Sequence, residues 1–193
     1  MRINRYIAQC GVGSRRKCDE YIANGLIKVN GIIKTDFSYN VKKNDLVQFN
    51  NKLIELPDLE TYILNKPKGY ICTKKDSLQR KLIYDLLPDK SLFSIGRLDY
   101  DTTGIILVTN DGDLSYKLTH PKFNVKKKYN VLTDAKLSKK NIKDIANGLK
   151  INRKNILKAK ISYLCKVHNK YEWDITLTEG KNREIKRIFN YFN

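Results

Sequence analysis

The chain has 193 residues, of which 41% are hydrophobic, with 38 Lys and Arg against 20 Asp and Glu and a formal net charge of +18. This hydrophobic content excludes a disordered chain. No apolar run approaches the ~20 residues of a membrane span and no signal peptide opens the chain, so we expect a cytoplasmic protein without a membrane partner. The excess of positive charge predicts binding to a polyanion, most commonly nucleic acid.

Two helices and a hairpin are predicted in the first 50 residues. Apolar spacing indicates a helix from Ile3 to Cys10, and Ser14 is typical of the N-cap of a second helix over residues 15–24. Asn30-Gly31 favours a type I′ turn between two strands, 26–29 and 32–34. Short strands are expected over 46–49 and 53–56.

Three cations, Arg15, Arg16 and Lys17, fall in the first turn of the second helix. This end of a helix is electrostatically unfavourable for cations, whereas a phosphate there is attracted by both the helix dipole and the side chains. We interpret the cluster as an RNA or DNA contact, and the alternative is a solvated basic face.

The polar stretch 56–61, with Pro57, is the predicted linker between two domains, residues 1–56 and 62–193.

Short strands alternate with short helices after the linker. Strands are expected over 62–65, 70–73, 92–95, 105–108, 126–131, 161–164 and 173–177. Helices are expected over 82–87, 113–119, 137–147, with Ile142, Ile145 and Ala146 inward, and 182–189, with Ile185, Ile188 and Phe189 inward. Because strands dominate, the sequence predicts an α+β fold with a mainly antiparallel or mixed sheet flanked by helices.

A polar loop lies between the strands 92–95 and 105–108 and carries Arg97, Asp99 and Asp101. Polar loops held between strands are common positions for site residues. The alternative is a solvated connection whose aspartates cap turns.

The four cysteines form no Cys-x-x-Cys pair and have no histidine cluster beside them, so we expect neither a metal site nor a disulfide.

The helix-helix-hairpin pattern of residues 1–50, with Ser14-Arg15-Arg16 and Val29-Asn30-Gly31, resembles the small RNA-binding module called the S-four domain. The resemblance implies one RNA-facing side, formed by Arg2, Arg5, Arg15, Arg16, Lys17 and Lys28.

Four motifs of the second domain resemble the pseudouridine synthases of the RsuA/RluB family. They are Lys66-Pro67-x-Gly69; Gly96-Arg97-Leu98-Asp99 with Thr103-Gly104 and Thr109-Asn110-Asp111-Gly112; Lys128-x-x-Val131 enclosing Tyr129; and Glu179-Gly180-x-Asn182-Arg183-x-Ile185-Lys186-Arg187. The resemblance implies isomerisation of uridine to pseudouridine in ribosomal RNA, without metal or redox cofactor. Residues 96–110 and Asn182-Arg183-x-Ile185 are most similar to the RluB branch, which favours large-subunit RNA, and we expect a monomer.

The resemblance also implies the roles of individual residues. Asp99 is the catalytic nucleophile, attacking either the anomeric carbon or the uracil ring. Lys186 pairs with this aspartate, Tyr129 stacks on the target base, and Arg97 occupies the space of the flipped nucleotide. Lys66 and Arg183 are further candidates for substrate binding.

The chain ends inside or just after its last predicted helix, whereas family members usually continue for several tens of residues. We therefore expect a C-terminally shortened catalytic domain, and a catalytically silent RNA-binding assembly factor is the alternative function. A glycoside hydrolase using Asp99 with Asp101 is disfavoured, because no partner carboxylate has the separation that hydrolases use.

Overall fold

The computed structural model describes residues 1–89, 91–152 and 155–192. The chain divides into two compact units, Met1–Tyr116 and Lys117–Asn193. Every pair of strands within the sheets is antiparallel, which agrees with the predicted α+β class.

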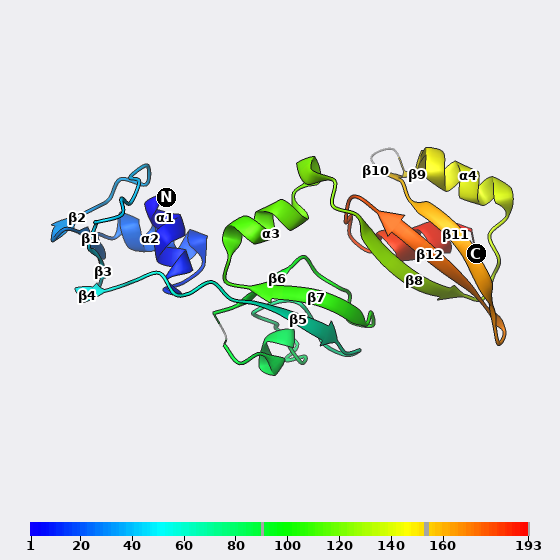
Figure 1. Ribbon diagram of the computed structural model, residues 1–193, viewed down its shortest axis with the longest axis horizontal. Coiled ribbons are helices and arrows are strands. Elements are labelled where there is room, and N and C mark those ends of the chain that lie inside the picture. The colour runs from blue at the N-terminus through cyan, green and yellow to red at the C-terminus, as the bar shows by residue number, and fades with distance from the viewer. Residues whose placement is uncertain (90, 153–154, 193) are drawn as a thin grey trace. The chain divides into compact units, whose positions relative to one another are not determined.

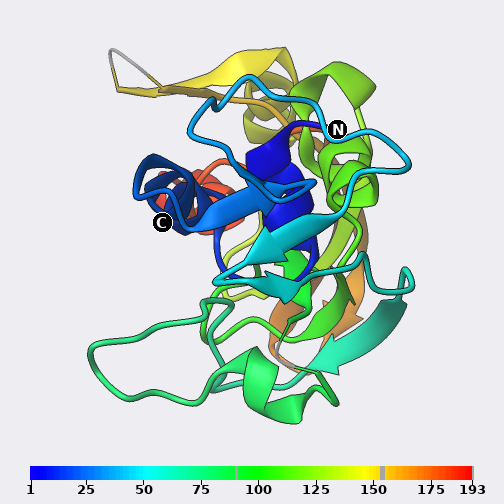
Figure 2. The same ribbon diagram turned by 90° about the vertical axis from the view of Figure 1, so that its left-hand side faces the viewer.

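The first unit opens with two helices on a small sheet of strand order β2-β1-β3-β4 (Figures 1 and 2). Its elements are α1 (Ile3–Gln9), α2 (Arg15–Ala23), β1 (Ile27–Val29), β2 (Ile32–Ile33), β3 (Val47–Phe49) and β4 (Lys52–Leu53). The Ser14 side chain accepts a hydrogen bond from the Lys17 amide, and Asn30 and Gly31 both have positive φ angles, 53° and 80°. The predicted N-cap and hairpin are therefore confirmed.

The second part of this unit is a three-stranded sheet of order β5-β7-β6. Its elements are β5 (Thr61–Lys66), the 3-10 helix η1 (Ile83–Leu86), β6 (Phe93–Ile95) and β7 (Gly104–Thr109), followed by α3 (Gly112–Thr119). Ile83, Ile106 and Val108 lie in its core.

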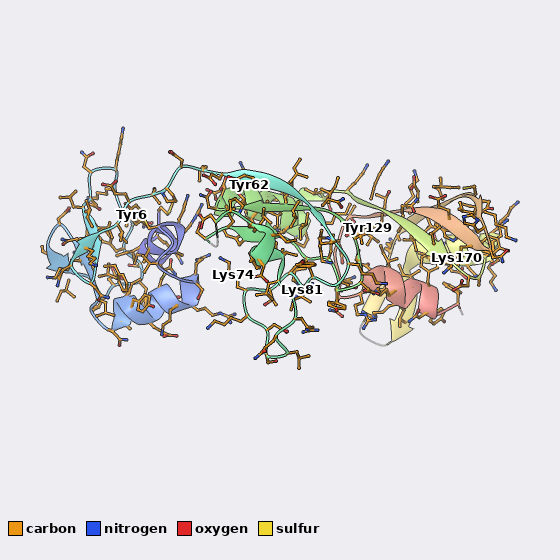
Figure 3. All side chains as sticks on the ribbon, turned by 90° about the horizontal axis from the view of Figure 1, so that it is seen from below. Tyr6, Tyr62, Lys74, Lys81, Tyr129 and Lys170 are labelled. Atoms are coloured by element: carbon orange, nitrogen blue, oxygen red, sulfur yellow. The ribbon has the colours of Figure 1, made fainter. Side chains whose placement is uncertain are left out.

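In the segment between β5 and β6, one prediction is wrong and one is confirmed in part. The strand predicted over 70–73 makes one isolated bridge, Ile71 with Leu82, and the helix predicted over 82–87 is a single 3-10 turn. The cause is that the segment packs individual side chains, such as Cys72 and Tyr84, under β7 without regular pairing. Lys74 and Lys81 lie on this segment (Figure 3) and place their ammonium groups over tyrosine rings.

The second unit is a three-stranded sheet of order β11-β12-β8 with helices packed on its core. Its elements are η2 (Pro121–Phe123), β8 (Lys127–Thr133), α4 (Lys139–Gly148), β9 (Leu149–Asn152), β10 (Asn155–Leu157), β11 (Lys160–Val167), β12 (Lys170–Leu177) and α5 (Glu184–Asn190). Trp173 is fully buried at the centre of the core and donates a 2.8 Å hydrogen bond to the Thr133 hydroxyl.

The predicted helices and strands of this unit are present, with two differences. The hairpin β9–β10 was not predicted, because its strands have only four and three residues. Ala146 is exposed rather than inward, since the buried side of α4 centres on Ile145. Ile188 and Phe189 of α5 are buried, as expected from the helical spacing.

Candidate active site and RNA-binding surfaces

The loop of residues 96–103, which contains Asp99, joins β6 to β7 in the first unit. It closes on itself through a 3.1 Å hydrogen bond from the Thr102 amide to the Asp99 carbonyl. Gly96 and Gly104 bound the loop with φ angles of +76° and +125°, which favour glycine. The Asp99 side chain is half-buried, and its backbone is fixed by a turn that includes it.

Lys66, the last residue of β5, supports this loop from inside. The side chain is 0% exposed, and its ammonium group donates hydrogen bonds to the carbonyl oxygens of Pro67, Tyr100 and Thr102, at 3.0, 3.4 and 2.7 Å. Burial lowers the pKa of Lys66, while Cys72, Asp101 and Asp99 act in the opposite direction. A buried ammonium with three acceptors is compatible with folding because its donors are satisfied.

The turn after Lys66 adds a further contact. The Gly69 amide donates a 2.8 Å hydrogen bond to the Tyr100 carbonyl, and Gly69 has a φ of +86°. The motif Lys66-Pro67-x-Gly69 therefore holds residues 100–102 through its first and last members. Lys66 was a candidate for substrate binding, but the structure places its side chain inside the unit.

Cys72 contacts the backbone of the 96–103 loop at Leu98, the residue before Asp99. Its thiol donates a 3.4 Å hydrogen bond to the Leu98 carbonyl, and the Leu98 side chain packs on the core of this unit. Burial is the main cause that raises the pKa of the Cys72 thiol. Neither Cys72 nor Gly69 was expected to support the site, because nothing in the sequence shows that they contact residues about 30 positions away.

Tyr129, Lys186 and Arg183 belong to the second unit. Tyr129 lies opposite Ile175 in the β8–β12 ladder and is half-buried against the core (Figure 3). Lys186 lies on α5 and is half-buried, and exposed Arg183 is the N-cap residue of α5, with φ +48°. The predicted site residues are thus divided between units, with Arg97, Asp99 and Lys66 in the first.

The start of α5 is fixed by Glu184, which the sequence analysis did not single out. The Glu184 side chain is 4% exposed and accepts a 2.9 Å hydrogen bond from the Lys181 amide. A carboxylate in the first turn also interacts favourably with the helix dipole. Glu184 therefore positions the turn that carries Arg183 and precedes Lys186.

The predicted RNA-facing cations of the N-terminal module have different surroundings. Arg2, Arg15, Arg16 and Lys17 are exposed, and Lys28 is half-buried on β1. Arg5 forms an ion pair with Asp113 of α3, a contact that was not predicted.

Asn110 holds the polar stretch that was predicted to be a linker. Its side chain accepts a 2.8 Å hydrogen bond from the Glu60 amide and donates one of 2.8 Å to the Asp58 carbonyl. The preceding Thr109 hydroxyl donates to the Glu60 carbonyl. The stretch is therefore attached to the end of β7, although its side chains are exposed.

A model of the RNA pseudouridylate synthase family matches residues 60–191, and a model of the S4 domain matches residues 1–47. The chain belongs to the RNA pseudouridylate synthase family. This membership confirms both resemblances inferred from the sequence.

The free cysteines of this synthase form no disulfide, and the described part of the chain contains no cluster of three or more metal-ligating side chains. Among the same residues, no helix is long and apolar enough to cross a membrane.

Known pseudouridine synthases resemble the chain over almost its whole length. It is 34% identical to "Ribosomal large subunit pseudouridine synthase B" of Bacillus subtilis, over 97% of this chain and 79% of that protein. It is also 34% identical to "Dual-specificity RNA pseudouridine synthase RluF" of Escherichia coli, over 100% of this chain and 66% of that protein. A crystal structure of a pseudouridylate synthase matches with a TM-score of 0.64 and 28% identity, over 100% of this chain and 83% of that chain.

Proposed function

We propose that this protein isomerises uridine to pseudouridine in ribosomal RNA, with large-subunit RNA as the substrate. The observation that carries the proposal is the succession of an S4 domain and an RNA pseudouridylate synthase domain in one chain. The name of the Bacillus subtilis relative supports the large subunit as the source of the RNA. We propose domains at 1–56 and 62–193, acting as a monomer in the cytoplasm without metal or cofactor.

The reaction breaks the glycosidic bond between N1 of uracil and the ribose, rotates the base, and joins C5 to the same ribose carbon. The proton on C5 is lost when the new bond is complete, and N1 ends protonated. Asp99 is the proposed nucleophile, because a carboxylate is ionised at neutral pH and can leave again. Its attack is on the anomeric carbon or on the uracil ring.

The environment of the loop supports this role for Asp99. Lys66, Gly69 and Cys72 contact the backbone on both sides of Asp99, so the carboxylate is held by a loop with few degrees of freedom. Fixed geometry lowers the entropic cost of reaching the attacking position. Lys66 accordingly acts as a positioning residue, and phosphate contact is left to exposed cations.

The other proposed roles follow the family motifs. Lys186 pairs with the Asp99 carboxylate, Tyr129 stacks on the target base, and Arg97 fills the space of the extruded nucleotide, whose unstacking costs on the order of a few kcal/mol. RNA phosphates are contacted by Arg183 and by the module cations, namely Arg2, Arg5, Arg15, Arg16, Lys17 and Lys28. RNA must displace Asp113 before it can contact Arg5.

The proposal is tested with an unmodified transcript of large-subunit ribosomal RNA, by mapping pseudouridines as reverse-transcription stops after carbodiimide treatment. Asp99→Asn should reduce the rate of stop formation by roughly 10³-fold or more. Asp101→Asn is the matched control, because it makes the same change two residues away on an exposed side chain, and it should retain activity. Stops that persist with Asp99→Asn would refute the nucleophile, and RNA binding without modification by the wild type would support the assembly-factor alternative.

A further inference from the structure

A cleft of about 460 Å³ lies in the second unit, and none of the residues assigned to catalysis is among those that line it. It is lined by four lysines, two threonines and an apolar wall: Lys126, Lys128, Lys158, Lys160, Thr176, Thr178, Ile142, Ala146, Ala159 and Ile161. No carboxylate is among these residues. The cleft is therefore strongly basic, and the four lysines are exposed.

The strand register arranges some of these polar side chains in a row. Lys128 of β8 and Lys160 of β11 both lie opposite Thr176 of β12, which gives one Lys-Thr-Lys row across the sheet. Lys126, Thr178 and Lys158 lie just beyond the ends of these three strands and line the same cleft, and we call them the second row.

The face of the sheet that carries this Lys-Thr-Lys row is opposite to the one that carries Tyr129. Consecutive strand residues point to opposite faces, and Tyr129 packs toward the core while Lys128 is exposed. The lysines and Thr176 therefore lie on the other face of the sheet from Tyr129, whereas Ile161 of the apolar wall belongs to the same cross-strand row as Ile175 and Tyr129. Among the described residues, no carboxylate forms an ion pair with any of the four lysines.

We propose that this cleft binds the phosphate backbone of the RNA substrate outside the catalytic pocket. The inference rests on the proposed function, which supplies RNA as the ligand. Lysine ammonium groups on both sides of a threonine row can contact successive phosphates, and threonine hydroxyls can donate to phosphate oxygens. Charge neutralisation by the lysines releases counterions, so their contribution to binding decreases as salt increases.

The test compares two double variants of the full chain that each remove two positive charges. Lys128→Gln with Lys160→Gln removes the lysines of one row. Lys166→Gln with Lys170→Gln is the matched control at the far end of the β11–β12 hairpin, about 20 Å along the strand. Lys170 is labelled in Figure 3. Affinity for the unmodified large-subunit transcript is measured from 50 to 200 mM KCl, together with the kinetics of pseudouridine formation.

The cleft variant should reduce the slope of log affinity against log salt by about 1.4, which corresponds to about 0.7 for each lost contact with a single strand. It should raise KM several-fold and leave kcat unchanged, while the control pair keeps the wild-type slope and KM. An unchanged slope in the cleft variant, or equal losses in both variants, would overturn the proposal.

Two further measurements keep the test decisive. Thermal unfolding followed by the fluorescence of Trp173, the one tryptophan of the chain, should be the same in all variants. If the first cleft variant does not fold, Lys126→Gln with Lys158→Gln tests the second row with the same expected slope. A wild-type protein that binds the transcript without modifying it would refute the proposed function, whereas the comparison of slopes would still decide whether the cleft binds RNA.

Discussion

The loop of residues 96–103 and the helix α5 carry the two charged groups proposed to meet at the target uridine, yet they are held by different forces. The loop is fixed by polar contacts to its backbone, chiefly from the buried ammonium of Lys66. Helix α5 is fixed by apolar packing of Ile188 and Phe189 on the core of Trp173, with one buried carboxylate, Glu184. The conformation of the loop therefore depends mainly on one side chain, whereas the position of α5 depends on several.

Replacing Lys66 should therefore produce the largest structural effect. Lys66→Met keeps the length of the side chain but removes the charged donor to three carbonyl groups, and losing a hydrogen bond to a charged group costs about 1.5–3 kcal/mol. Amide hydrogen exchange should accelerate at Gly69 and Thr102, whose amides bond within this network. Activity should fall at least tenfold in kcat, because Asp99 is less well positioned.

The control for this change is Lys68→Met, which alters an exposed lysine of the same motif. It should change the free energy of unfolding by less than about 0.5 kcal/mol. Trp173 fluorescence, which reports on the second unit, should show the same transition in both variants. Equal exchange rates at Thr102 in the two variants would contradict the assigned role of Lys66.

The helix should respond less, and its response should be visible in the other unit. Glu184→Ala removes the acceptor of the Lys181 amide and a carboxylate near the helix N-terminus, which together contribute about 1–2 kcal/mol. Because Phe189 lies 6.3 Å from Trp173 between ring centroids, the fluorescence transition of Trp173 should shift to lower temperature. The matched control is Glu179→Ala, which removes an exposed carboxylate paired with Lys181.

Glu179→Ala should leave the transition nearly unchanged, since exposed ion pairs contribute little. If both glutamate variants lower the transition equally, the buried carboxylate has no special role at the start of α5. In that case α5 would be held by its apolar contacts alone.

The contrast also explains which parts of the site could be predicted from the sequence. Helix α5 was predicted from the helical spacing of Ile185, Ile188 and Phe189, and the N-terminal hairpin from Asn30-Gly31. Each of these patterns is local in the sequence. The position of Asp99 in a polar loop between two strands was likewise predicted.

The supports of the loop could not be predicted in this way, because they depend on tertiary contacts. A lysine is usually exposed, so the pattern around Lys66 gave no sign of an inward side chain. Cys72 and Tyr84 pack in one core cluster with Ile106 and Val108 of β7, and these tertiary contacts leave a single bridge and a 3-10 turn where a strand and a helix were predicted. The cleft could not be predicted either, because Lys128 of β8 and Lys160 of β11 come together only through their common partner β12.

The smallest effect is expected where the loop is held by a weak donor. Cys72→Ala removes the thiol that donates to the Leu98 carbonyl, at a cost of about 1 kcal/mol because a thiol is a weak donor and the side chain is small. Leu98 keeps its apolar contacts, so kcat should fall by less than about threefold. The control is Cys165→Ala, which changes an exposed thiol in the second unit. Hydrogen exchange at Thr102 should accelerate slightly with Cys72→Ala and not with Cys165→Ala. A loss as large as that of Lys66→Met would show that the thiol, rather than the buried ammonium, is the main support of the loop.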